Sequence, residues 1–150
     1  MVAQIAAPGG SPADEFLVKE GRSFGARPRP ADVPQMPRGW CFVNAACLLL
    51  YHDDWNFGEG YVLGANGEVA MHGWAVTAEG DVVDPTFQPP EVTEYYGVVF
   101  QREPYLKWVG DCRGDADVLW SFRCFERKDA ALKRGEPPLP LMGPARIPSQ

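Results

Sequence analysis

The chain has 150 residues, 45% of them hydrophobic and 12% aromatic, a composition typical of one globular domain. Its net charge of −6 argues against nucleic acid as the main partner, because phosphate binding needs a basic surface. Its apolar runs are too short to cross a bilayer, and residues 1–7 lack the basic start of a signal peptide. We therefore expect a cytoplasmic protein without membrane contact.

The four cysteines, at positions 41, 47, 112 and 124, form no Cys-x-x-Cys pair. This spacing does not favour a zinc site, so we expect no metal and no cofactor. In the cytoplasm the cysteines would be reduced, although Cys112 and Cys124 could pair in an oxidising compartment.

Prolines concentrate at the two ends of the chain, with six before Gly39 and five after Gly135. We expect residues 1–34 to be a largely disordered or extended segment, with a short helix from Asp14 to Glu20. Residues 35–134 should form the folded domain, and residues 135–150 a Pro-rich tail.

The first element expected within the domain is a buried helix over 41–51, which is apolar nearly all round. Four strands follow, at about 60–64, 68–77, 80–84 and 95–101. Asn-Gly at 66–67 and Glu-Gly at 79–80 supply the hairpin turns between the first three.

A last helix is expected over about 115–134, because Val118, Leu119, Phe122 and Phe125 make an apolar stripe and Gly135 is a stop signal. One helix, an antiparallel sheet and a closing helix predict an α+β domain.

Three residues in chain order suit a catalytic triad: Cys41, His72 and Asp84. A thiol nucleophile needs a nearby base, and the base needs a group that orients it. Cys41 stands where the helix should begin, and a helix N-terminus lowers a thiol pKa. His72 lies on a strand that a tight turn joins to the strand ending at Asp84, so the two side chains are expected to meet. Each residue alone also fits a structural role in the core or a turn.

The segments 39–41, 60–62, 72–76 and 82–86 resemble the transglutaminase-like branch of the papain-like cysteine enzymes. In that family a Gly-x-Cys begins the core helix, a Gly-Tyr strand follows, a His-x-Trp strand supplies the base, and a strand ending Asp-Pro-Thr supplies the acid. The resemblance implies a nucleophile helix packed on a small antiparallel sheet. It gives Cys41 the role of nucleophile, His72 that of general base and acid, and Asp84 that of orienter.

Residues 38–44 also look like the cysteine motif of arylamine N-acetyltransferases, which use the same triad order. That family is much longer and carries a glutamate near position 43, where this chain has valine. We rank this second resemblance lower.

Four further residues are candidates for the oxyanion site or for substrate contact: Gln35, Trp40, Trp74 and Glu59. Gln35 precedes Cys41 at a spacing similar to that of the oxyanion-hole glutamine of papain-like proteases. The two tryptophans could wall an acyl-binding cleft, and Glu59 precedes the Gly-Tyr strand. The alternatives are a solvated glutamine in a Pro-rich loop and two core aromatics, and Glu59 is supported by its position alone.

We therefore expect a cysteine-dependent amide or isopeptide hydrolase, or an acyl transferase, that forms a covalent acyl-enzyme. Its partner would be a peptide, a protein or a small amide or thioester. The main alternative is a catalytically inactive domain of the same fold that binds a peptide or small ligand.

Overall fold

A five-stranded antiparallel sheet forms the centre of the computed structural model, which describes residues 1–5 and 10–143. The strand order is β1-β5-β2-β3-β4. The strands are β1 (Arg22–Gly25), β2 (Asn56–Gly64), β3 (Val69–Val76), β4 (Val82–Val83) and β5 (Val92–Phe100). The four strands expected from the sequence are therefore present with shifted ends, and the α+β class is confirmed.

Both predicted hairpin turns are also present, each with a glycine in the left-handed region. Gly67 has a φ of 85° and Gly80 a φ of 92°, values that residues with a Cβ rarely adopt. The first turn joins β2 to β3, and the second joins β3 to β4.

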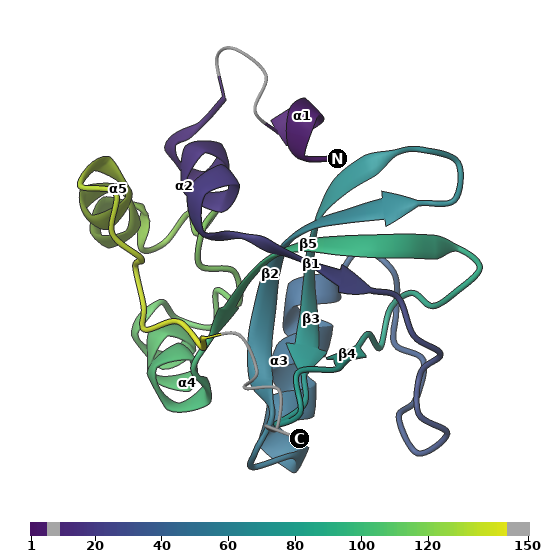
Figure 1. Cartoon of the computed structure of the whole chain (residues 1–150). Coiled ribbons are helices and arrows are strands. Elements are labelled where there is room, and N and C mark those ends of the chain that lie inside the picture. The colour runs from purple at the N-terminus through teal and green to yellow at the C-terminus, as the bar shows by residue number, and fades with distance from the viewer. Residues whose placement is uncertain (6–9, 144–150) are drawn as a thin grey trace, which may run out of the picture.

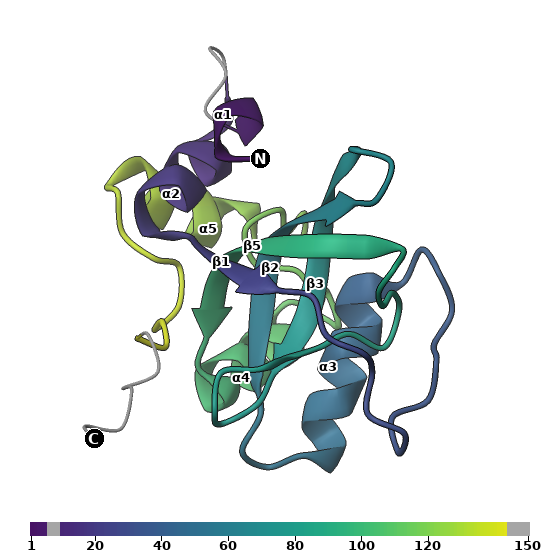
Figure 2. The same cartoon turned by 45° about the vertical axis from the view of Figure 1, so that its right-hand side comes forward.

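Helices cover one face and one side of the sheet. They are α1 (Val2–Ile5), α2 (Pro12–Glu20), α3 (Cys41–Tyr51), α4 (Arg102–Asp111) and α5 (Phe125–Lys133). Helix α3 lies behind β2 and β3 in Figure 1 and packs mainly on β3. Figure 2 shows α2 and α5 side by side at the end of the sheet away from α3.

Alternation along the strands separates two apolar clusters. Phe57 and Ala75 face α3 and pack with its Leu48 and Leu49. The opposite face carries a smaller cluster of side chains from all five strands: Phe24, Val62, Trp74, Val76, Val82, Val92, Tyr95 and Val99.

The N-terminal segment is more ordered than its proline content indicates. Ser11 and Asp14 form a reciprocal capping box at the start of α2, and Phe16 and Leu17 of that helix are buried. Strand β1 then pairs with β5. The described part of the segment 1–34 therefore contains the helix expected at 14–20 and also α1 and β1, while residues 26–34 form no helix or strand.

The expected helix over 115–134 is present only in its second half, as α5. Residues 112–124 form a loop instead, because the backbone N–H groups of Val118 and Leu119 donate to the Glu59 carboxylate rather than to helical carbonyls. A disulfide between Cys112 and Cys124 closes this loop. The expectation that all four cysteines are reduced is therefore wrong for this pair.

The described part of the Pro-rich tail follows the sheet. The Pro140 carbonyl accepts from the Gln101 N–H at 3.0 Å, and Leu141 forms an isolated bridge with Phe100. The rest of the predicted tail, 144–150, lies outside the described residues.

Candidate active site

Cys41 is the first residue of α3, and its side chain is half-buried. Gly39 enters the helix with a φ of 84°, and the N-cap residue Trp40 makes no side-chain hydrogen bond to the first turn. The N–H groups of that turn are therefore left uncapped by a side chain. Together with the helix dipole, they stabilise negative charge at the position of the thiol.

His72 and Asp84 form a buried hydrogen-bonded pair. The distance from His72 Nε2 to Asp84 Oδ2 is 2.7 Å, and the residues are only 1% and 2% exposed. The pairing of Ala75 with Val83 brings together the strand that carries His72 and the strand that leads to Asp84. The hairpin predicted from the sequence is thus the physical cause of this contact.

The start of α3 lies against a stretch of β3 that β4 leaves unpaired. Strand β4 pairs with β3 only at Ala75 and Val76, so it leaves the edge at His72 and Gly73 to the start of α3. A Cβ on Gly73 would lie 2.7 Å from Phe42 Cδ1 and 3.2 Å from Phe42 Cα. The glycine therefore permits a close approach of helix and strand that any larger residue would oppose.

The electrostatics of this arrangement favour a thiolate beside an imidazolium. Burial raises the pKa of Cys41, but the hydrogen bond and charge of His72 and the N–H groups of Gly73 and Phe42 bring that pKa below its ordinary value. Burial lowers the pKa of His72, yet hydrogen bonds to Asp84 and Cys41 raise that pKa to about 9. Because Nε2 faces Asp84, Nδ1 is the ring nitrogen left for an interaction with the thiol.

The Asp84 carboxylate is fixed by its own loop. Its Oδ1 accepts from the backbone N–H groups of Thr86 at 2.8 Å and Phe87 at 3.1 Å. Asn44 in α3 donates from Nδ2 to Thr86 Oγ1 at 3.0 Å and to the Pro37 carbonyl at 2.8 Å. Asn44 therefore ties the nucleophile helix to the loop that carries the acid.

Two of the four further candidates, Trp40 and Gln35, lie on the surface. Trp40 precedes Cys41 and is 62% exposed, so its ring is open to solvent. Gln35 is exposed, and the next residue, Met36, donates its N–H to the Pro85 carbonyl at 2.8 Å. This bond places the Gln35 loop against the Asp-Pro-Thr loop.

The other two candidates are buried away from any substrate. Trp74 is fully buried and packs against Phe24 and Tyr95, as the core alternative predicts. Glu59 is also 0% exposed, and its carboxylate accepts from Val118 and Leu119 in the loop before α5. Neither side chain is placed to line a cleft.

Three residues that shape the site were not predicted from the sequence: Asn44, Gly73 and Tyr95. The Tyr95 hydroxyl donates to Asp84 Oδ2 at 2.7 Å. Asn44 could have been identified from the sequence, because it is a polar residue in an otherwise apolar helix. Its side chain is only 5% exposed. No local pattern marks Tyr95, because its contact depends on the order of strands in the sheet.

A hollow of about 460 Å³ lies next to the site, over the hairpin of β2 and β3. Phe87 lines it and separates it from His72, whose ring stacks on Phe87 at 5.1 Å. The Arg38 guanidinium covers the Phe87 ring at 5.0 Å and pairs with Glu91.

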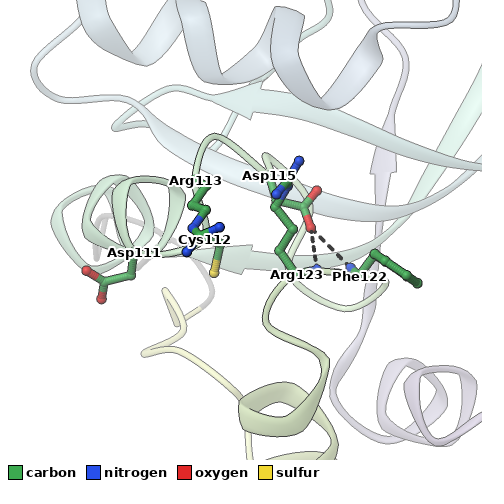
Figure 3. Close-up of a pocket in the computed structure, with 6 residues that line it drawn as sticks. All are labelled: Asp111, Cys112, Arg113, Asp115, Phe122 and Arg123. Carbon is green, nitrogen blue, oxygen red and sulfur yellow. Dashed lines mark hydrogen bonds between the residues drawn. The ribbon is translucent and has the colours of Figure 1, made fainter.

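A second hollow, of about 630 Å³, lies at the disulfide loop. Figure 3 shows Asp115 at its wall, where the carboxylate accepts from the backbone N–H groups of Phe122 and Arg123. Cys112 lines this hollow but is held in the disulfide, so it offers no thiol.

Within residues 1–5 and 10–143, no group of His, Cys, Asp and Glu side chains is placed to hold a metal ion. No helix in the same ranges combines the length and the apolar character that crossing a membrane requires. No family model, curated protein or solved structure matches the chain.

Proposed function

We propose that the protein is a cysteine-dependent amide hydrolase or acyl transferase with a papain-like or transglutaminase-like core, acting through a covalent acyl-enzyme. The observation that carries this proposal is the buried His72 ring, with Asp84 on one nitrogen and the Cys41 thiol on the other side. A ring held between an acid and a thiol can receive and return a proton.

In the first step the Cys41 thiolate attacks the carbonyl carbon of the substrate and forms a sulfur–carbon bond. The uncapped N–H groups at the start of α3 stabilise the negative charge on the carbonyl oxygen. His72 gives its Nδ1 proton to the leaving nitrogen, the carbon–nitrogen bond breaks, and a thioester remains on Cys41.

In the second step His72 takes a proton from water or from an acceptor amine, whose attack on the thioester releases the acyl group and restores the thiolate. Trp40 flanks the thiol and would contact the substrate, and Gln35 remains a candidate second donor to the oxyanion. The substrate would be a peptide, a protein or a small amide or thioester.

The test uses an activated ester, p-nitrophenyl acetate, with the full chain. We expect an acetyl group on Cys41 by intact-mass and peptide mass spectrometry, followed by continued release of p-nitrophenolate as the acyl-enzyme turns over. Cys41→Ala should abolish both, with an unchanged circular dichroism spectrum. Cys47→Ala is the matched control, because Cys47 is the other free thiol and lies on the same helix.

Equal acetylation of Cys41 and Cys47 would contradict the proposed enzymatic function. Release of p-nitrophenolate that persists in Cys41→Ala would also contradict it. Stoichiometric acetylation of Cys41 without turnover of any acyl donor would favour the binding module instead.

A further inference from the structure

The Tyr95 hydroxyl shares an acceptor with the candidate general base. It donates to Asp84 Oδ2 at 2.7 Å, and His72 Nε2 lies 2.7 Å from the same oxygen. Tyr95 belongs to β5, which is separated from β3 by β2, so this contact links the site to the centre of the sheet.

The hydrogen bond from the Tyr95 hydroxyl completes the set of donors around the Asp84 carboxylate. Oδ1 accepts from the N–H groups of Thr86 and Phe87, and Oδ2 accepts from His72 and Tyr95. A carboxylate offers about four lone-pair sites, so these donors occupy its whole capacity. The carboxylate cannot rotate without breaking a buried hydrogen bond.

Tyr95 is itself held rigidly. It is 0% exposed, and its ring lies 5.1 Å from that of Trp74, which in turn stacks near His72. Burial and the negative charge of Asp84 raise the pKa of Tyr95 above its ordinary value of 10.0, so the hydroxyl keeps its proton and remains a donor.

We propose that Tyr95 is a positioning residue of the triad, whose hydroxyl fixes the Asp84 carboxylate and limits how strongly that carboxylate holds the His72 proton. A donor on Oδ2 draws charge away from the oxygen that faces the ring. The catalytic consequence rests on the proposed function, but the effect on His72 is a property of the folded protein and can be measured without a substrate.

Few charged groups face His72 from the surrounding elements. Cys41 approaches from α3, and Asp84 approaches from the loop after β4. Trp74 on β3 and Phe87 on the following loop are uncharged neighbours of the ring. Arg38 stands on the far side of Phe87, where it pairs with a glutamate. The proton affinity of His72 is therefore governed by Asp84, the thiol and the donor on Asp84.

The experiment is a pH titration of the histidine ring signals by NMR in the wild type and in Tyr95→Phe. The chain has two histidines, so only two sets of ring signals need to be assigned. We expect the His72 midpoint, about 9 in the wild type, to rise by about 0.5 pH unit or more when the hydroxyl is removed.

Tyr96→Phe is the matched control. Tyr96 is the next residue on β5, and its buried hydroxyl donates to the Leu17 carbonyl at 3.1 Å, away from the triad. Losing this bond should leave the His72 midpoint in place. An unchanged midpoint in Tyr95→Phe, or an equal change in Tyr96→Phe, would overturn the proposal.

Incorporation of 3-fluorotyrosine gives an independent test that preserves the hydroxyl. A more acidic phenol donates more strongly, so the His72 midpoint should fall rather than rise; a rise would contradict the assignment. These outcomes are separate from a failure of the proposed function, which would appear as an unreactive Cys41 in the wild-type protein.

Discussion

The protein buries two carboxylates that look alike in isolation, Asp84 and Glu59. They are 2% and 0% exposed, and each accepts hydrogen bonds from two consecutive backbone N–H groups. Backbone donors can compensate for the loss of water around a buried carboxylate. Burial and backbone contacts therefore do not distinguish a catalytic acid from a structural one.

The ionisable side chain next to each carboxylate distinguishes Asp84 from Glu59. Asp84 meets the His72 ring, whose pKa rises to about 9, so the pair can carry a positive and a negative charge together. Glu59 lies near Asp117, and burial together with this like charge raises the pKa of Glu59 well above its ordinary value of 4.5. One carboxylate stabilises a cation beside a thiol, and the other holds a loop in place.

Neutralising Asp84 should give the largest effect. In Asp84→Asn the amide nitrogen cannot accept, so buried donors such as the Tyr95 hydroxyl lose their partner, and we expect about 3 kcal/mol of destabilisation. His72 would then be neutral at pH 7, and iodoacetamide labelling of Cys41 should slow by roughly 30-fold. Mass spectrometry of each thiol measures the rate, with Cys47 as the internal reference. Labelling at the wild-type rate would separate Asp84 from the chemistry.

Gly73 lies where the two regions meet, because it pairs with Glu59 across β2 and β3 and contacts the start of α3. Gly73→Ala should cost about 1–3 kcal/mol by overpacking against Phe42 and should slow Cys41 labelling several-fold. Denaturant unfolding and the labelling rate measure the two effects.

Gly110→Ala is the control for this variant. No heavy atom lies within 4 Å of the position of a Cβ on Gly110, which is in α4, so this change should be neutral or stabilising by up to about 1 kcal/mol. If Gly73→Ala also left stability and labelling unchanged, the close contact of helix and strand would not matter for the thiol.

Neutralising Glu59 should give the smallest effect. At low pH we expect Glu59→Gln to lower the free energy of unfolding by about 1 kcal/mol, because an amide oxygen can still accept from the N–H groups of Val118 and Leu119. A carboxyl group whose pKa rises on folding binds its proton more tightly in the native state. Wild-type stability should therefore fall as the pH rises from about 4.5 toward the raised pKa, and this fall should be smaller in Glu59→Gln.

Thermal unfolding at pH 5 and pH 8 measures this difference, and Cys41 labelling should be the same in both proteins. A Glu59→Gln variant with slow labelling would show that the two carboxylates act on one site.

Local signals in the sequence were sufficient for the central part of the fold. Gly67 and Gly80 marked both hairpin turns, and an apolar run marked α3 from its first residue, Cys41. The ends of the chain were harder to predict because their order depends on distant partners. Strand β1 exists through its pairing with β5, and the loop before α5 is held by Glu59 and by the disulfide rather than by its own helical pattern.

The sequence by itself determined the core of the candidate site. A tight turn favours the pairing of β3 with β4, and this pairing brings the strand that carries His72 close to the strand that leads to Asp84. Only the tertiary structure decided that β5 lies beside β2, which carries the Tyr95 hydroxyl to Asp84, and that a loop far along the chain covers Glu59. Hairpin pairing is a short-range choice set by turn chemistry, whereas strand order and loop docking depend on packing the whole core.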